Sequence, residues 1–368
     1  MVDIPFFKKI TFPKFSLGFI FGKPTSVIGI DIGTHSAKVV QLKYESERAI
    51  LETYGELLTE GYLKSAGGGG GFLRYLDSDI SSLLKDLLRE SNVTTKEAVL
   101  SVPAEASFIT LISFPRISKR EIDAAVPYEA RKYVPIPAAE VVLDWDIFES
   151  EAETDTIDVL LVAVPREIVE KYKRVAELAG IHARALEVET FSIVRSLMGT
   201  DPTPTAIINL GQTSTTLSLV DRGRVRISHN FSRGSQELTR ALERGMNITR
   251  ERAEEIKRTT GLSERIEERE ITSIMAPLVE TLFAEIERMI ALYNRKAPRK
   301  IQKINLTGGG SNLKGIVDYV SGKFGVEVSR GNPFARMVTP AFMQPTLREI
   351  GPSFSVAAGL ALREITTR

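Results

Sequence analysis

Cysteine is absent from the 368-residue sequence, and histidine occurs only three times. Without cysteine the chain can form no disulfide and no thiolate site. His35, His182 and His229 are too far apart in the sequence for the usual spacing of metal ligands. No apolar run approaches the roughly 20 residues of a membrane helix, and the N-terminal stretch does not resemble a cleaved signal peptide. These absences predict a cytoplasmic protein.

An excess of charge of either sign is also lacking. Lys and Arg together number 48 and Asp and Glu 47, so the formal net charge is +1. This balance gives no electrostatic reason to expect nucleic acid as a partner. The length is sufficient for two or more domains, each with its own core.

Residues 1–25 differ from the rest of the chain. The first 24 positions hold six phenylalanines and four lysines, with a single aspartate. One hypothesis is a basic, aromatic arm that touches an anionic membrane surface or a partner. The alternative is a tail that docks on its own domain or stays disordered.

Apolar periodicity predicts where helices and strands lie. A capping box formed by Ser118 and Glu121 opens one helix, which Pro127 should kink or divide. The other helices are expected at 72–90, 166–179, 190–198, 235–244, 249–259, 275–295 and 354–365. The strands are expected at 27–31, 37–44, 50–58, 98–115, 141–148, 156–164, 183–188, 205–231 (as a meander) and 301–306.

One short pattern occurs twice, at a constant offset of 178 positions. Ile-Asp-Ile-Gly at 30–33 corresponds to Ile-Asn-Leu-Gly at 208–211, and Ser36 corresponds to Ser214. In both places an apolar strand runs into a polar residue and a glycine, turns, and leaves as another strand. The sequence therefore predicts two similar half-domains, each with one strand–turn–strand unit.

The chemistry of this repeated unit suits a polyphosphate. A glycine lets the backbone approach a phosphate, and backbone N–H groups and small hydroxyls can bind its oxygens. Asp31 could face a hydrated Mg²⁺, which prefers a carboxylate plus several waters, and Lys38 could reach a phosphate. The residues predicted to bind the polyphosphate are Gly33, Thr34, His35, Ser36, Lys38, Asn209, Gly211, Gln212, Thr213 and Ser214.

A third glycine element follows the strand expected at 301–306. Gly308, Gly309 and Gly310 stand between that strand and a helix, and such a turn tolerates close approach of a base, sugar or phosphate. The run Gly67–Gly71 is different, because it lacks the Gly-Lys-Ser/Thr ending of a phosphate-binding P-loop. We expect that run to be a flexible loop.

Together these residues resemble the actin-type ATPase superfamily. Within it, the chain is most similar to the PilM family of type IV pilus assembly proteins, with the cell-division protein FtsA as a near cousin. The more specific segments are VIGIDIGTHSAKVVQL, ISKREIDAAVPYEARKYVPIP, VVLDWDIF, ALEVETFSIVRSL and TGGGSNLKG. The resemblance implies an α/β, actin-like (ribonuclease-H-like) two-lobed fold with an inserted α+β subdomain.

The resemblance also implies a division into subdomains. The expected parts are a first actin-like subdomain (26–98, 184–200 and 346–368), an insert (99–183), a second actin-like subdomain (203–233 and 301–345) and a helical subdomain (234–300).

Mg-ATP is the ligand that the resemblance implies. Glu189 matches a position where related proteins place a carboxylate near the metal or the attacking water. Glu254 and Lys257 match a helix that reaches the ribose and adenine, although a solvated helix face would also explain their charges. Asn209 stands where many relatives have aspartate and brings no negative charge. Slow ATP hydrolysis and binding without turnover therefore both stay open.

The partner that the resemblance implies is the N-terminal cytoplasmic tail of a PilN-type inner-membrane protein. Arg131, Tyr133 and Trp145 are candidate contacts, because arginine and aromatic residues often anchor interfaces. Trp145, the only tryptophan, could instead belong to the core. We expect a cytoplasmic protein held at the inner membrane through its partners, and homo-oligomerisation stays open. The alternative function is that of an FtsA-like, membrane-associated filament protein of cell division.

Overall fold

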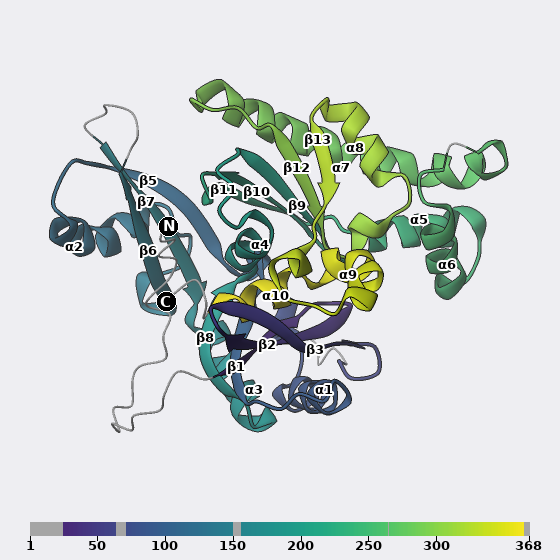
Figure 1. The fold of residues 1–368 in the computed structure, drawn as a ribbon. Helices are drawn as coiled ribbons and strands as arrows, with labels where there is room; N and C mark the ends of the chain where they lie inside the picture. The colour runs from purple at the N-terminus through teal and green to yellow at the C-terminus, as the bar shows by residue number, and fades with distance from the viewer. Residues whose placement is uncertain (1–24, 64–70, 150–155, 264, 364–368) are drawn as a thin grey trace. The chain divides into compact units, whose positions relative to one another are not determined.

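A computed structural model describes residues 25–63, 71–149, 156–263 and 265–363 (Figure 1). The predicted N-terminal arm and most of the Gly67–Gly71 run lie outside the described residues. The chain divides into two units. Unit 1 comprises 1–196, 335–339 and 356–368, and unit 2 comprises 197–334 and 340–355. The predicted four-subdomain division stays a prediction.

A five-stranded sheet forms the centre of unit 1, in the order β3-β2-β1-β4-β8. Strands β1, β4 and β8 are parallel to one another, and β2 runs antiparallel between β1 and β3. Strands β1, β2 and β4 are buried along almost their whole length, as expected of central strands in a sheet covered on both faces, whereas the edge strand β3 is partly exposed. Their bounds are β1 Ser26–Ile32, β2 Ser36–Glu45, β3 Arg48–Leu58, β4 Glu97–Val102 and β8 His182–Val188.

Small residues let the closing helix approach this sheet. Helix α10 (Ser355–Ala361) lies against β1 and against α4 (Glu189–Met198). A Cβ on Gly29 would lie 2.0 Å from the carbonyl oxygen of Ala357, and a Cβ on Gly359 would lie 1.8 Å from that of Ser192. Glycine is therefore required at both contacts. Helices α1 (Asp77–Glu90) and α3 (Arg166–Ala179) pack against each other and against the same sheet.

The insert of unit 1 is a separate three-stranded antiparallel sheet in the order β5-β7-β6, with helix α2 packed on it. Its elements are β5 Phe108–Pro115, α2 Lys119–Glu129, β6 Val141–Glu149 and β7 Thr156–Pro165. The capping box of Ser118 and Glu121 is confirmed. Pro127 does not divide the helix: it lies in the last turn, and a 3-10 turn, Ala130–Lys132, follows.

Unit 2 contains the second five-stranded sheet, in the order β11-β10-β9-β12-β13. Its apolar core combines strands β9, β10 and β12 with helices α5, α7 and α8. The strands are β9 Thr205–Leu210, β10 Thr215–Asp221, β11 Arg224–Phe231, β12 Lys303–Thr307 and β13 Glu327–Arg330. The helices are α5 Gln236–Met246, α6 Arg250–Thr260, α7 Arg269–Lys296, α8 Ile316–Phe324 and α9 Gln344–Ile350.

The predicted duplication is confirmed by the strand pairing. In both sheets an antiparallel three-strand meander is followed by two strands parallel to its first member. Asp31 lies opposite Lys38 on β2, and Asn209 lies opposite Thr216 on β10. The offset of 178 positions thus holds residue by residue across both hairpins.

Some element boundaries differ from those predicted. The helix expected at 72–90 begins only at Asp77, after a 3-10 turn at Gly71–Arg74, and α7 begins six residues earlier than expected, at Arg269. Strand β13 was not predicted, because its four residues are mostly polar and exposed. Among the described residues, no helix combines the length and the apolar character needed to cross a membrane.

Candidate functional site

The hairpin of β1 and β2 carries most of the residues predicted in unit 1. The N–H of Gly33 donates to the carbonyl of Ser36 at 3.1 Å and closes the turn. Thr59, just after β3, fixes the turn from outside: its hydroxyl donates to the carbonyl of Thr34 at 2.8 Å, and its N–H donates to that of His35 at 3.0 Å. These contacts hold the turn in one conformation.

Lys38 lies between two carboxylates of the same sheet. It is opposite Asp31 on β1 and opposite Glu56 on β3, and its ammonium group lies 3.2 Å from the Glu56 carboxylate. Ser36 accepts a hydrogen bond from Lys38 and donates one to Glu56 at 2.6 Å. Burial acts to raise the pKa of Glu56, but Lys38 and Ser36 outweigh it and leave that pKa lowered. Sequence reasoning missed Glu56, which only the strand register identifies.

Asp31 is almost fully buried at the end of β1, with 7% of its surface exposed. The hydroxyl of Ser101 on β4 donates to its carboxylate at 2.8 Å. Burial raises the pKa of Asp31, and the opposing effects of Lys38 and Ser101 do not cancel that rise. The carboxylate therefore lacks part of the positive charge that its ionised form needs.

Glu189 stands at the end of β8, as the first residue of α4. Part of its side chain still contacts solvent, but protein surrounds the carboxyl closely enough that burial raises its pKa well above the usual range. The charge of Asp31 adds to this effect. The structure thus brings Asp31 and Glu189, which are far apart in the sequence, to one end of the unit 1 sheet.

Tyr172 of α3 is a neighbour of this acid pair that the sequence did not predict. It is fully buried and stacks on Phe72, with 4.5 Å between ring centroids. Within the described part of the chain its hydroxyl has no hydrogen-bond partner. Burial raises its pKa well above the ordinary value, and the charges of Glu189 and Asp31 raise it further. Its helical apolar spacing alone predicts only a core residue.

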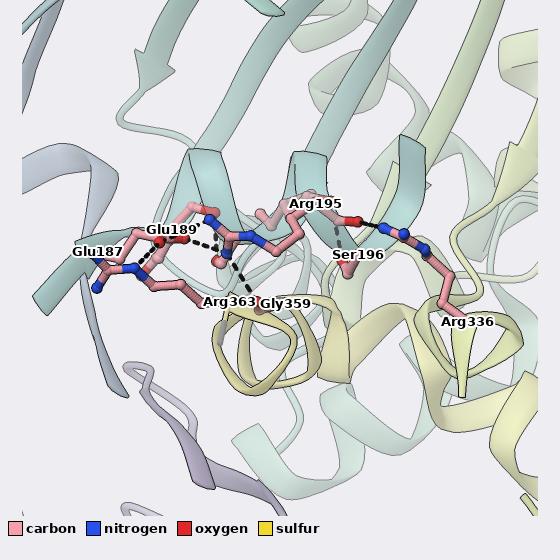
Figure 2. A network of polar contacts seen from close by, with 9 residues as sticks. Glu187, Glu189, Arg195, Ser196, Arg336, Gly359 and Arg363 are labelled. Carbon is pink, nitrogen blue, oxygen red and sulfur yellow. Dashed lines mark hydrogen bonds and ion pairs between the residues drawn. The ribbon is translucent and has the colours of Figure 1, made fainter. Parts of the chain in front are cut away.

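A second carboxylate of β8, Glu187, belongs to a buried ion network (Figure 2). The guanidinium of Arg195 on α4 donates to both of its oxygens, at 2.7 and 2.9 Å, and Arg363 approaches at 3.3 Å. Arg195 also donates to the carbonyl of Gly359 at 2.9 Å, and Arg336 donates to the carbonyl of Arg195. This network joins β8, α4 and the region of α10, and so supports the strand end that carries Glu189.

The corresponding turn of unit 2 has the same backbone but different side chains. The N–H of Gly211 donates to the carbonyl of Ser214 at 2.9 Å, as in the first hairpin. The start of α5 packs on the turn, because the N–H of Gln236 donates to the carbonyl of Gln212 at 3.0 Å. Thr213 lies in the same turn, between Gln212 and Ser214. The N–H of Ser235 likewise donates to the carbonyl of Gly211 at 2.9 Å, so the first N–H groups at the start of α5 are used to hold the turn.

The glycines after β12 differ in their surroundings. Gly308 has a φ of +79°, and a Cβ there would lie 2.5 Å from the side-chain oxygen of Asn209. A Cβ on Gly310 would lie 2.9 Å from the Cβ of Leu210. A Cβ on Gly309 would meet only the hydroxyl of Ser353, at 3.9 Å. Packing on the end of β9 therefore explains two of the glycines, and Gly309 is the one with room for a ligand.

Glu254 and Lys257 of α6 bind each other at 2.6 Å. The ammonium group of Lys257 is buried and donates to Thr239 of α5 at 3.0 Å. Burial acts to raise the pKa of Glu254, but Lys257, Thr239 and Arg258 lower it to about 2. This pair accounts for both charges within unit 2, so their predicted contact with a ribose or adenine stays a prediction.

The candidate partner residues lie on the insert. Arg131 and Tyr133 follow α2 and are exposed, and the guanidinium of Arg131 lies over the ring of Tyr128, 5.4 Å from its centroid. Trp145 of β6 is only half-buried, and it packs against the core of the insert. Its indole N–H donates to Asp123 at 2.8 Å. Arg131 and Tyr133 are therefore the more accessible candidates.

The acid pair of unit 1 fits a hydrated magnesium ion better than a fully protein-bound one. Within the described ranges, no group of three or more His, Asp or Glu side chains is placed to hold a metal. Mg²⁺, however, usually keeps several waters and takes one or two carboxylates. Asp31 and Glu189 both have raised pKa values, and a divalent cation would supply the positive charge that stabilises their ionised forms.

Known proteins resemble the chain in sequence and in fold. The cell-division protein FtsA of Enterococcus hirae is 22% identical over 82% of this chain and 77% of its own length. A chain of the solved PilM-PilN type IV pilus biogenesis complex is 25% identical to this one. The match covers 92% of this chain and 98% of that chain, with a TM-score of 0.79.

More distant structures share the fold alone. MreB 5 of Spiroplasma citri, solved with AMPPNP, is 11% identical with a TM-score of 0.51. The match covers 92% of this chain and 95% of the MreB 5 chain.

A sequence profile of the family described as type IV pilus assembly protein PilM matches residues 29–365. The chain has the actin-like fold and belongs to the PilM family of type IV pilus assembly proteins.

Proposed function

We propose that the chain binds Mg-ATP, with the magnesium ion and a phosphate at the glycine hairpin of unit 1. The observation that carries this proposal is the acid pair of unit 1, in which Asp31 and Glu189 lie at one end of a sheet with raised pKa values. Asp31 and Glu189 would hold the magnesium ion through its waters, and Lys38 would bind a phosphate. The equivalent turn of unit 2, at Gln212, Thr213 and Ser214, is a second candidate for binding phosphate oxygens. Magnesium would neutralise charge on the phosphates when bound.

Turnover would be slow. Asn209, at the position equivalent to Asp31, can accept a hydrogen bond but adds no charge. ATP would therefore act mainly as a ligand that favours one conformation of the chain, through a difference in affinity between conformations.

We also propose that the chain docks the N-terminal cytoplasmic tail of a PilN-type membrane protein. The PilM-PilN complex supports this partner, because a chain of that complex shares the fold at a TM-score of 0.79. Arg131 and Tyr133 would contact the tail, because both are exposed beside Tyr128, which is 70% exposed. Such a complex would place the chain at the inner membrane, as part of the platform for pilus assembly.

Calorimetric titration with Mg-ATP tests the nucleotide proposal. We expect Asp31→Ala to lose binding, whereas Asp318→Asn, an exposed acid on α8, should bind as the wild type does. Wild-type protein that takes up no Mg-ATP would disprove the proposal. Phosphate release measured on the same samples separates binding from turnover.

A synthetic tail peptide tests the partner proposal. Arg131→Ala and Tyr133→Ala should each weaken peptide binding about tenfold, which corresponds to about 1.4 kcal/mol. Arg120→Ala, an exposed arginine on α2, is the matched control. Equal affinities for all three variants would exclude this surface as the docking site.

An FtsA-like filament is the second candidate function. The 22% identity to the FtsA of Enterococcus hirae, over most of both chains, favours it. Sedimentation with and without Mg-ATP distinguishes the two functions. Nucleotide-dependent pelleting would support the filament, and protein that stays in the supernatant would support the docking function.

A further inference from the structure

One end of the unit 2 sheet gathers basic side chains from three elements, and we call it the basic end. Here the β10–β11 hairpin turns, with Asp221 opposite Arg224, and β9 and β12 begin, with Thr205 opposite Lys303. Helix α7 ends at the same place, because Arg299, just after it, binds Asp221 at 2.6 Å. Figure 1 shows these strands and α7 within unit 2.

The charge of the basic end is strongly one-sided. Within the described ranges, the acids at this end are Asp221, which is buried and bound to Arg299, Asp201, which lies 3.5 Å from Lys303, and Glu327, which is opposite Lys303 on β13. The whole chain, by contrast, carries a formal net charge of only +1. The basic residues are Arg222, Arg224, Arg226, Arg295, Lys296, Arg299, Lys300 and Lys303.

An ordinary solvated surface does not explain this excess. On α6, basic and acidic residues alternate and pair, as Arg252 does with Glu255 and Arg258 with Glu254. The C-terminal dipole of α7 favours Arg295 and Lys296 in its last turn. It does not account for the arginines of the β10–β11 hairpin, which lie on no helix.

We propose that the basic end binds a membrane surface of anionic phospholipids. Its charges are spread over a hairpin tip, a helix end and a strand start, on long side chains that suit a surface of many phosphates. Leu292 is 48% exposed and precedes Arg295 and Lys296 by one helical turn, so it can enter the headgroup layer beside them.

An acidic peptide fits the same surface less well. Peptides gain affinity from an open strand edge or from a row of side-chain pockets. Arg224 and Arg226 lie on β11, which is an edge strand of the sheet. The other basic residues lie at the tip of the hairpin, at the end of α7 and in the segment after it, and at the start of the inner strand β12, so a peptide added to β11 would leave most of the basic end uncovered. Among the described residues, Leu292 is the large apolar side chain exposed at this end. The proposal is independent of the nucleotide site, so either can fail without the other.

The test is flotation of the full chain with lipid vesicles. We would compare pure phosphatidylcholine with vesicles in which a third of the lipid is phosphatidylglycerol. The test variant replaces Arg222, Arg295, Lys296 and Lys300 by Gln. The matched control replaces four exposed arginines of α5 and α6 by Gln: Arg240, Arg244, Arg250 and Arg252. Circular dichroism of both variants verifies that they are folded.

The wild-type chain should bind the anionic vesicles and not the neutral ones. Each basic residue near an anionic surface contributes about fivefold in affinity, so we expect a loss of roughly a hundredfold or more in the test variant. The control variant should lose much less, and added salt should weaken the wild type most. Equal losses in the two variants would overturn the proposal, as would equal binding to neutral vesicles. Binding of a polyglutamate peptide in place of vesicles would also overturn it.

Discussion

The two five-stranded sheets have the same strand order, but equivalent positions carry different chemistry. Where unit 1 has a buried acid opposite a lysine, unit 2 has an amide opposite a hydroxyl. Val102 is the last residue of β4, whereas β12 ends one position earlier and is followed by Gly308, which has a positive φ. The backbone topology thus does not require the charges, so their presence in unit 1 alone points to a ligand. The equivalent pairs, from strand register, are Asp31 and Asn209, Lys38 and Thr216, Ser101 and Thr307, Val102 and Gly308, and Glu187 and Gly331.

Removal of the buried guanidinium in unit 1 should have the largest effect on stability. Arg195→Ala leaves Glu187 buried beside Arg363 alone, and breaking a buried ion pair costs about 3–5 kcal/mol. In unit 2 the edge strand β13 carries Arg330, which is exposed, so Arg330→Ala should change stability by less than about 0.5 kcal/mol. Urea unfolding measures both. Similar midpoints for the two variants would contradict the expectation that the buried ion pair on β8 stabilises the protein more than the exposed Arg330 on β13 does.

The glycines after β12 should show a smaller but clear difference. Gly308→Ala introduces a Cβ 2.5 Å from the Asn209 side chain at a positive φ, and should destabilise the protein by roughly 2–4 kcal/mol. Gly309→Ala meets no close atom and should be nearly neutral for stability. Thermal unfolding tests this pair. Reduced Mg-ATP affinity in a fully stable Gly309→Ala variant would add that this turn contacts the ligand.

A reciprocal exchange tests the two hairpin heads directly. Asp31→Asn should lower Mg-ATP affinity at least about tenfold, or about 1.4 kcal/mol, because it removes the charge facing the metal. Asn209→Asp should change affinity by about threefold or less, because the amide is not committed to the metal. Chelation of magnesium with EDTA should remove most of the difference between wild type and Asp31→Asn. Equal effects of the two exchanges would mean that the hairpins are chemically equivalent.

The smallest effects should appear as opposite dependences of stability on pH. Asp31 has a raised pKa in the folded state, so the folded chain holds more protons than the unfolded one, and stability falls as pH rises from the ordinary value of 3.8. Asp31→Asn should therefore stabilise the ligand-free protein at neutral pH, by roughly 1 kcal/mol, and the gain should disappear in acid.

Glu254 of unit 2 provides the opposite sign. Its pKa is lowered from 4.5 to about 2, so its stabilising effect is fully present above 4.5 and is lost as pH falls towards 2. Glu254→Gln should lower the thermal midpoint at neutral pH, by no more than about 1 kcal/mol in free energy because the pair is partly exposed. Midpoints that shift in the same direction for both variants would contradict the assigned pKa directions.

The sequence predicted the features that depend on local pattern. The offset of 178 positions identified the two hairpins, because side chains on strands and in glycine turns have a fixed period and composition. The capping box at Ser118 was found for the same reason. Local patterns could not predict Glu56, Ser101 or Tyr172, because each reaches the site through strand register or helix packing that joins distant segments.

The glycines after β12 also show that local sequence pattern does not predict contacts between distant segments. The sequence interprets Gly308 and Gly310 as room for a ligand, and that contact stays a prediction; the structure adds that both glycines pack against the end of β9. The position of β13 was missed because four polar residues carry no strand signal. The packing of these glycines and the position of β13 both depend on which strands lie next to β12. That neighbourhood cannot be predicted from a single sequence.

The contact of Gly29 with α10 has a consequence for how the protein is made. Tyr44 and Ala361, which are hydrogen-bonded across the same contact, are 317 residues apart in the chain. During translation the apolar surface of β1 therefore stays uncovered until α10 has been synthesised. Unit 2 lies almost entirely within this interval and can fold first. Chaperones that bind nascent chains would thus be expected to protect the early strands of unit 1.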